Sequence, residues 1–317
     1  MQSYLDFEQP VADLAVQIRE LKRLSEKGEA VDVESEVARL EAKRDDALRD
    51  LYAKLTPWQR MQVARHPDRP HFVDYRDALF TEWTELAGDR KFAEDAAVLA
   101  GMARFEGRPV MLIGQERGHD TASRVKHNFG SARPEGYRKA VRLMEMAERF
   151  GMPIVSLVDT AGAYPGLGAE ERGQAEAIAR STQMCLRVKV PIVTLIIGEG
   201  GSGGAIAIAT GDRVFMLENA IYSVISPEGA ASILWRDAAR AKDAATAMKI
   251  TARDLKDMGI IDGIVPEPPG GAHRYREAVM ESVGRTIRDA LDELSGMEPD
   301  ALRAARRKKY VEIGRSL

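Results

Sequence analysis

Two short apolar segments of nearly the same sequence constrain the fold of this chain more than any other feature. They are Pro153-Ile-Val-Ser-Leu-Val158 and Pro191-Ile-Val-Thr-Leu-Ile196. Such self-similarity indicates a repeated strand–helix unit. Both segments are rich in β-branched residues and too short for a helix, which is typical of strands that are buried on both faces of a sheet.

Each predicted strand leads into a glycine-rich segment and then into a helical pattern. The glycine-rich segments cover residues 159–166 and 198–204. Helical periodicity follows over residues 175–186 and starts again at Ala205, and a further helix is predicted over residues 135–150. The sequence therefore predicts an α/β fold with a mostly parallel sheet. Both glycine-rich segments would lie at the carboxyl ends of their strands, where such sheets bind ligands.

The front of the chain is predicted to be helical. Apolar residues recur at helical spacing from Val11 to Leu24 and again from Val33 to Leu55, and Gly28 lies between the two stripes as a stop signal. We expect an antiparallel helical hairpin, which could be a packing appendage or an arm that clasps another chain. Residues 56–95 show no clean period after Thr56-Pro57 starts a third element, so we expect short helices and loops there.

These patterns predict three parts. Residues 1–95 form a helical N-terminal extension and partner-binding arm, residues 96–274 form the α/β domain, and residues 275–317 form a C-terminal helical segment. The basic run Arg306-Arg-Lys-Lys309 near the end is expected to be a solvated or docking end.

Composition excludes several classes of protein. The net charge of −3 argues against a general binder of nucleic acid or anionic membranes, because such partners select a basic face. The single cysteine, Cys185, cannot form an intrachain disulfide, and the first residues lack the pattern of a secretory signal. The longest strongly apolar stretch, Val190 to Ile197, is too short to span a bilayer. We expect a cytoplasmic protein without a membrane segment.

The second glycine-rich segment matches two unrelated catalytic patterns. Gly198-x-Gly200-x-x-Gly203 is a dinucleotide fingerprint, with Glu218 placed to contact a ribose. Gly200-x-Ser202-x-Gly204 is equally a nucleophile elbow, with Asp262 and His273 following in hydrolase order. Because the same residues satisfy two incompatible mechanisms, neither match is strong. The fingerprint normally opens its domain, and the two triad partners lie unusually close together in sequence.

Both glycine-rich segments offer backbone N–H groups. Consecutive glycines before a helix let a ligand approach closely, and the amides of the first helical turn have no partner within the helix. Such a site suits a developing oxyanion on a thioester, a ureido oxygen or a phosphate. The four glycines Gly200, Gly201, Gly203 and Gly204 exceed what a helix start needs, which favours a functional role.

A metal site is not indicated by the sequence. The histidines are His66, His71, His119, His127 and His273, and with the single cysteine they show no zinc-ligand spacing. We therefore predict no metal in this chain.

Further motifs extend from one end of the chain to the other. They are Leu5-Asp-Phe-Glu-Gln-Pro10, Gly107-Arg-Pro-Val110, Asn128-Phe-Gly130, Arg133-Pro-Glu-Gly-Tyr-Arg-Lys-Ala140, Gly162-Ala-Tyr-Pro-Gly166, Ala169-Glu-Glu-Arg-Gly-Gln174, Gly198 to Gly204, Tyr222-Ser-Val-Ile-Ser-Pro-Glu-Gly229 and Gly270-Gly-Ala-His273. Together they closely resemble the carboxyltransferase alpha subunit of bacterial acetyl-CoA carboxylase. Ala161, where that family has Pro, and Gln115-Glu116, where it has His-Gln, depart from the pattern but leave the glycines intact.

The resemblance implies a crotonase-type spiral of βα units, with residues 96–274 as the carboxyltransferase domain. It implies transfer of a carboxyl group from carboxybiotin on a carrier protein to acetyl-CoA, which gives malonyl-CoA for fatty acid biosynthesis. The implied partners are a carboxyltransferase beta subunit, with the active site between the two subunits, the biotin carboxyl carrier protein and biotin carboxylase. An α2β2 heterotetramer within a larger complex is the expected assembly.

The resemblance also implies a set of site residues. The backbone amides of Gly203 and Gly204 are expected to form the catalytic oxyanion hole on the biotin side. The expected substrate-binding residues are Gly162, Ala163, Tyr164, Pro165, Gly166, Gly200, Gly201, Ser226, Pro227, Glu228 and Gly229. For Ser226 to Gly229 the simpler interpretation is helix capping, because Ser followed by Pro is typical of a helix start.

Two further interpretations stay open. A non-catalytic scaffold that only docks a partner through its helical arm is the alternative from another class, and the intact glycine segment argues against it. A set of basic residues could meet CoA phosphates, but a solvated face is the simpler interpretation. This set is Arg117, Arg124, Lys126, Arg133, Arg138 and Lys139.

Overall fold

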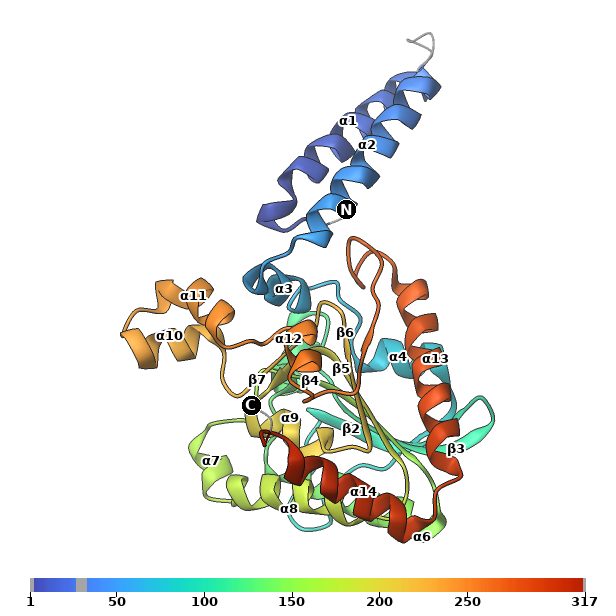
Figure 1. Cartoon of the computed structure of the whole chain (residues 1–317), viewed down its shortest axis with the longest axis vertical. Coiled ribbons are helices and arrows are strands. Elements are labelled where there is room, and N and C mark those ends of the chain that lie inside the picture. Colours follow the sequence, from blue (N-terminus) through green and yellow to red (C-terminus); the bar gives the residue numbers. More distant parts are fainter. Residues whose placement is uncertain (1–2, 27–32, 316–317) are drawn as a thin grey trace.

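The computed structural model describes residues 3–26 and 33–315, so Gly28 lies outside the described residues. A globular body is built around one sheet, and a helical arm extends from it (Figure 1). The strands are β1 (Phe80–Glu85), β2 (Val98–Phe105), β3 (Arg108–Gln115), β4 (Ile154–Thr160), β5 (Ile192–Gly201), β6 (Arg213–Leu217), β7 (Ile221–Ser223) and β8 (Gly263–Val265).

The sheet has eight strands in the order β1-β2-β3-β4-β5-β6-β8, and β7 pairs with the far end of β5. The strands β1, β2 and β3 are antiparallel neighbours. All other neighbours, from β3 to β8, run parallel. The mostly parallel sheet predicted from the sequence is confirmed.

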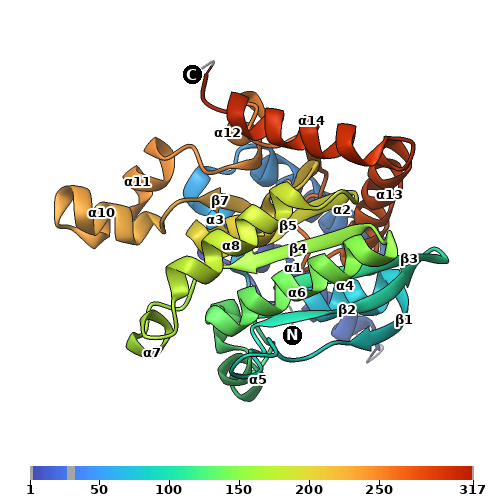
Figure 2. The same cartoon turned by 90° about the horizontal axis from the view of Figure 1, so that it is seen from below.

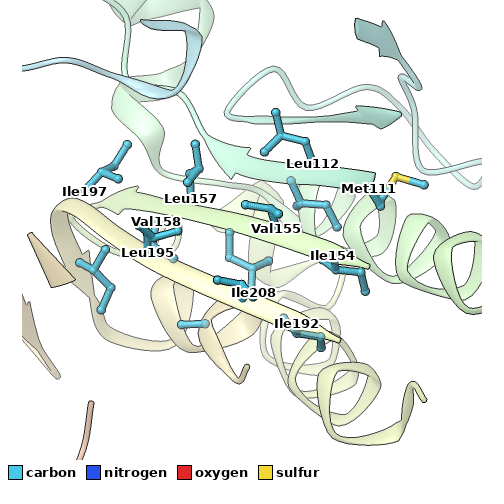
Figure 3. Close-up of a cluster of buried hydrophobic side chains, with 14 of the residues drawn as sticks. Met111, Leu112, Ile154, Val155, Leu157, Val158, Ile192, Leu195, Ile197 and Ile208 are labelled. Carbon is cyan, nitrogen blue, oxygen red and sulfur yellow. The ribbon is translucent and has the colours of Figure 1, made fainter. Parts of the chain in front are cut away.

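The two repeated segments lie side by side as β4 and β5. Ile154 pairs with Ile192, and the polar position of each repeat pairs with the other, Ser156 with Thr194. The hydroxyl oxygens of Ser156 and Thr194 lie 2.6 Å apart in the buried core. The apolar residues around them, such as Val155 and Leu195, fill both faces of the strands (Figure 3). Because the two strands pair in this register, the two buried hydroxyl groups form a hydrogen bond with each other.

Helices cover the sheet as the periodicity predicts. The longer ones of the body are α6 (Pro134–Phe150), α8 (Gln174–Arg187), α9 (Ser202–Ala209), α10 (Pro227–Trp235), α13 (Arg276–Ser295) and α14 (Pro299–Glu312). The shorter ones are α3 (Pro57–Ala64), α4 (Phe72–Leu79), α5 (Thr121–Lys126), α7 (Leu167–Glu170), α11 (Ala241–Ala247) and α12 (Ala252–Asp257). Three 3-10 helices are η1 (Asp6–Glu8), η2 (Asn128–Gly130) and η3 (Ala238–Arg240).

Helix α6 packs against α8, and α8 packs against α9. Figure 2 shows α6 and α8 in front of the strands. Helix α13 contacts α4, β5 and β8. No helix within the described ranges is long and apolar enough to cross a membrane.

The predicted helical hairpin is confirmed. Helices α1 (Gln9–Glu26) and α2 (Val33–Ala53) lie side by side and extend from the body (Figure 1). Their apolar stripes face each other and bury Leu14, Ile18, Val33, Val37 and Leu40. At the base of the arm, Glu8 accepts hydrogen bonds from Tyr52 at 2.7 Å and from Arg274 at 2.9 Å. The arm is thus attached to the body by a buried polar contact as well as by packing.

The prediction of only short helices and loops over residues 56–95 is wrong in one place. Helices α3 and α4 are present, but residues 80–85 form the edge strand β1, which pairs with β2. Only Phe80 at its start is buried, and the rest of the strand is half-buried or exposed. The segment lacks a clear apolar alternation, and pairing with β2 rather than local pattern makes it a strand.

The basic run near the C-terminus is not simply solvated. Arg306 is fully buried and binds Asp212 in a two-pronged ion pair. It also donates to the carbonyl oxygens of Cys185, Val188 and Val190. Periodicity could not reveal this role, because every partner of Arg306 comes from a distant segment. Helix α14 is therefore locked onto the body through this side chain.

Lys139 also departs from the expected solvated face. Its side chain is fully buried, forms an ion pair with Glu94 and donates to the backbone oxygen of Asp95 at 3.0 Å. The amphipathic pattern of α6 placed this lysine on the outside, and the segment before β2 covers it.

Candidate active site

Strand β5 joins helix α9 without a loop. The strand continues to Gly201, because Gly200 pairs with Thr160 of β4 and with Tyr222 of β7, and the helix begins at Ser202. The glycine signal predicts a loop over residues 198–204, and this prediction is wrong: strand pairing on both sides extends β5 to Gly201, and α9 covers residues 202–204. The result is a sharp strand-to-helix turn at Ser202.

The two glycine-rich segments meet at this turn. A Cβ atom added to Gly201 would lie 2.2 Å from the carbonyl oxygen of Ala161. A Cβ atom added to Gly204 would lie 2.7 Å from the backbone nitrogen of Ala163 and 2.8 Å from the carbonyl carbon of Gly162. Gly201 and Gly204 are thus required because the segment after β4 crosses the start of α9 at backbone contact distance.

A buried side chain joins the two segments further. The side-chain amide of Gln115, at the end of β3, donates to the carbonyl oxygen of Gly204 at 3.1 Å. Its side-chain oxygen accepts the backbone N–H of Asp159 at 3.2 Å. Gln115 belongs to the pair Gln115-Glu116 that departs from the family pattern, and it serves here as a clamp between the end of β4 and the start of α9.

The start of α9 offers accessible backbone amides. Ser202 has a φ of +53°, which is uncommon for a residue with a Cβ atom and typical of a strained functional turn. Gly203 is half-buried, whereas Gly204 is buried beneath it. No side chain caps this helix within the described residues. The N–H groups of the first turn therefore lack a side-chain acceptor, and the positive end of the helix dipole lies among them.

The segment after β4 is more open. Gly162 has a φ of +146°, and Pro165 is exposed. Tyr164 is held by its backbone, since its N–H donates to Ala132 and its carbonyl accepts from the Gln174 side chain at 2.8 Å. The guanidinium of Arg133 lies 4.8 Å from the centre of the Tyr164 ring. The ring occupies the space that a Cβ atom on Gly166 would need.

An ion-pair network supports the base of both segments, and sequence reasoning missed it. Arg117 contacts Asp159 at 3.1 Å and Glu199 at 3.4 Å, and Arg65 binds Glu199 at 2.6 Å. Burial lowers the pKa of Arg65, but its pairing with Glu199 and Glu228 outweighs burial and holds the pKa above its ordinary value. Asp159 lies near the end of β4, Glu199 lies in the second glycine-rich segment, and Arg117 belongs to the basic set, but nothing in the sequence joins them into a network.

The expected site residues of α10 connect to this network. Ser226 caps the helix, because its hydroxyl accepts the backbone N–H of Gly229 at 3.1 Å. Pro227 occupies the first turn, and Glu228 binds Arg65 at 2.7 Å. The capping interpretation is confirmed, and Arg65 links this helix start to Glu199 on the glycine-rich strand.

Tyr137 is a further residue that the sequence analysis did not single out. Its hydroxyl oxygen lies 3.1 Å from the position that a Cβ atom on Gly204 would occupy. The hydroxyl is buried and lacks a hydrogen-bond partner among the described residues, and burial raises its pKa above the ordinary range. The hydroxyl therefore remains available as a donor next to the crossing of the two segments.

The geometry does not support the two alternative mechanisms. Asp262 accepts from Lys309 and from the backbone of Val214, and His273 stacks on His66 with ring centres 3.8 Å apart. Burial, His66 and Arg274 lower the pKa of His273 to about 2, which is unsuited to a general base. Glu218 accepts the backbone N–H of Glu267 at 3.3 Å. These side chains are thus engaged elsewhere.

Solved structures with a similar fold come first. One chain of transcarboxylase 12S matches with a TM-score of 0.58 and 20% identity, over 71% of this chain and 41% of that chain. A chain of the Pseudomonas malonate decarboxylase hetero-tetramer matches with a TM-score of 0.59 and 17% identity, over 77% of this chain and 97% of that chain. The fold is that of the crotonase-like carboxyltransferases, as expected.

Sequence comparisons then define the family. Residues 4–314 match the family described as acetyl co-enzyme A carboxylase carboxyltransferase-like. The acetyl-coenzyme A carboxylase carboxyl transferase subunit alpha of Sinorhizobium fredii is 68% identical, and that of Agrobacterium fabrum 66%, each over the full length of both chains. This chain belongs to the family of acetyl-CoA carboxylase carboxyltransferase alpha subunits. It is a subunit of a transferase, and an alpha subunit implies a beta-subunit partner.

Proposed function

We propose that this chain, together with a beta subunit, transfers a carboxyl group from carboxybiotin to acetyl-CoA and forms malonyl-CoA for fatty acid biosynthesis. Identity of 66 to 68% over the full length of the cited alpha subunits supports the reaction. The observation that carries the proposal within the structure is the crossing of the two glycine-rich segments at the uncapped start of α9.

The fit of biotin to this site is supported by the donors available. The ureido oxygen of biotin is a hydrogen-bond acceptor, and the first turn of α9 presents the N–H groups of Gly203 and Gly204 without a side-chain competitor among the described residues. Carboxybiotin supplies the carboxyl group that is transferred. Gly203, which is half-buried, donates to the ureido oxygen, and Gly204 adds a second donor from beneath. Both stabilise the negative charge that develops on this oxygen.

The substrate-binding residues are proposed in two groups. Gly162, Ala163, Tyr164, Pro165 and Gly166 line the approach to α9 from the segment after β4, and Gly200 and Gly201 form the strand beneath it. Ser226, Pro227, Glu228 and Gly229 border the site through the contact of Glu228 with Arg65. The half-buried character of residues 162–164 supports a role in contacting a ligand.

The proposed partners follow from the family. The biotin carboxyl carrier protein delivers the cofactor, and biotin carboxylase carboxylates it again after each transfer. The chain forms an α2β2 heterotetramer with the beta subunit in the cytoplasm. The arm of helices α1 and α2 extends from the body and is proposed to clasp another subunit. Removal of residues 1–55 should weaken assembly with the beta subunit in sedimentation experiments. Assembly as strong as that of the full chain would show that the arm does not contribute to subunit binding.

The function is tested by reconstitution. The purified chain is assayed alone and then with the beta subunit for malonyl-CoA formation from acetyl-CoA and carboxybiotin. We expect product only from the mixture. A mixture that assembles but forms no malonyl-CoA would favour the scaffold interpretation.

A further inference from the structure

A group of metal-ligating side chains lies outside the proposed active site. His71 precedes helix α4, Glu116 directly follows β3, and His119 lies in the loop before α5. One potential ligand atom from each of the three residues lies within 4.8 Å of the others. The two imidazole rings are stacked, with centres 4.4 Å apart. None of these residues takes part in the proposed carboxyl transfer.

The buried imidazole of His71 supplies an independent reason to expect a ligand. Only 7% of its side chain is exposed, and its Nδ1 atom has no hydrogen-bond partner among the described residues. This atom lies 3.5 Å from the Oε1 atom of Glu116. A buried polar atom without a partner is costly, and a bound cation shared with Glu116 would remove that cost.

Neighbouring groups hydrogen-bond to these side chains and orient them, as groups around the ligands of known metal sites do. Glu116 accepts backbone N–H groups from Gly118 at 2.6 Å and from Val73 at 3.0 Å. The carboxylate of Asp74 lies 3.3 Å from the Nε2 atom of His119. Glu116 is therefore an oxygen donor whose orientation is fixed by two backbone N–H groups.

We propose that His71, Glu116 and His119 bind one divalent transition-metal ion of the zinc type. Two imidazoles and one carboxylate form a donor set that suits zinc, and an open coordination position can be filled by water. A cavity of about 170 Å³ adjoins the group and is lined by His71 and Gly118. Arg117 also lines this cavity, but its charge is balanced by Asp159 and Glu199.

The spacing of residues in the sequence does not predict this site, because His71 is far from Glu116 and His119 along the chain. The absence of a zinc-ligand pattern led to the expectation of no metal, but the fold brings the start of α4 against the end of β3. A bound ion would join these two segments. It would do so directly beside Arg117, which supports the ends of β4 and β5.

Zinc binding to the full chain tests the proposal. The protein is first treated with a chelator, and zinc is then titrated in competition with a chromogenic zinc indicator. We expect one equivalent to bind, and His119→Ala, a change at an exposed position, to weaken binding by about 10-fold or more. Thr121→Ala, at an exposed position in the same region, is the matched control and should bind zinc like the unchanged chain.

A second measurement identifies the ligands independently. Cobalt(II) bound to the chain should give visible absorption bands typical of nitrogen and oxygen ligation, and these bands should be lost in His119→Ala but kept in Thr121→Ala. Zinc should also raise the unfolding midpoint of the unchanged chain and of Thr121→Ala only. No saturable binding to the unchanged chain, or equal binding by His119→Ala, would overturn the proposal.

Discussion

The two glycine-rich segments follow strands of similar sequence but are under different physical constraints. In the segment of residues 198–204, Gly201 and Gly204 are buried, and neighbouring backbone atoms occupy the space that their Cβ atoms would need. After β4, Gly162 has space around it, but its φ of +146° disfavours other residues. In residues 198–204 glycine is needed for close packing, and in residues 159–166 it is needed for backbone conformation. A rigid donor site thus faces a more open loop.

The largest expected effect comes from removing one amide donor. Replacing Gly203 by glycolic acid turns its N–H into an ester oxygen and changes little else. Because loss of one oxyanion-hole donor is typically worth a factor of about 100 to 1000, turnover of the assembled complex should fall by that factor. Gly203→Ala keeps the N–H, and within the described ranges its new Cβ meets only the Ile178 side chain, at 3.3 Å, so it serves as the control. Equal turnover of the ester variant would remove Gly203 from the proposed mechanism.

The next largest effect is expected from a change at Gly201, which tests whether glycine is needed there for close packing. Gly201→Ala places a Cβ atom 2.2 Å from the Ala161 carbonyl oxygen, so one of the two backbones must move. We expect the free energy of unfolding to fall by about 3 kcal/mol or more, measured by urea denaturation. Gly296→Ala, where no described residue has an atom within 4 Å of the new Cβ and φ is −87°, should leave stability unchanged. A stable Gly201→Ala chain would show that the crossing is looser than described.

The segment after β4 should respond less to the same change. In Gly162→Ala the nearest atom to the new Cβ lies at 3.8 Å, so only the cost of the backbone conformation remains. That cost is about 1 to 3 kcal/mol, and the urea midpoint should therefore fall less than in Gly201→Ala. The reverse order of the two midpoints would contradict the distinction between packing and conformation.

The smallest effect is expected at Ser202. Ser202→Ala removes a hydroxyl, leaves every backbone amide in place and keeps a Cβ atom at the φ of +53°. Malonyl-CoA formation should stay within about threefold of the unchanged complex. If this variant is inactive in a folded, assembled complex, Ser202 acts as a nucleophile and the strand-to-helix turn is a nucleophile elbow after all.

Much of the fold follows from local patterns. The β-branched repeat predicted β4 and β5, and helical periodicity predicted α1, α2, α6 and α8. Strand β1 escaped prediction because its residues alternate weakly and pairing with β2 makes it a strand. The end of β5 was not predicted as a strand, because glycine usually indicates a loop. Pairing with β4 on one side and with β7 on the other keeps this segment in the sheet.

The site divides in the same way. The glycines and the Ser226 cap could be identified from sequence, because turn and cap chemistry depends on adjacent residues. The link from Arg65 through Glu199 to Arg117, the Gln115 clamp and the free hydroxyl of Tyr137 could not. Each joins segments that are distant in sequence, and periodicity carries no information about which distant segments meet.

The sequence by itself determined the βα units, the helical arm, the positions of the glycines and the family to which they point. These features depend on backbone preferences and on apolar spacing, which act between near neighbours. Only the tertiary structure decided which glycine is needed for space and which for conformation, and it placed Arg306 in the interior and His71 beside His119. The physical reason is that sheet order sets which strand ends meet, and close approach, buried ion pairs and ligand clusters exist only where they do.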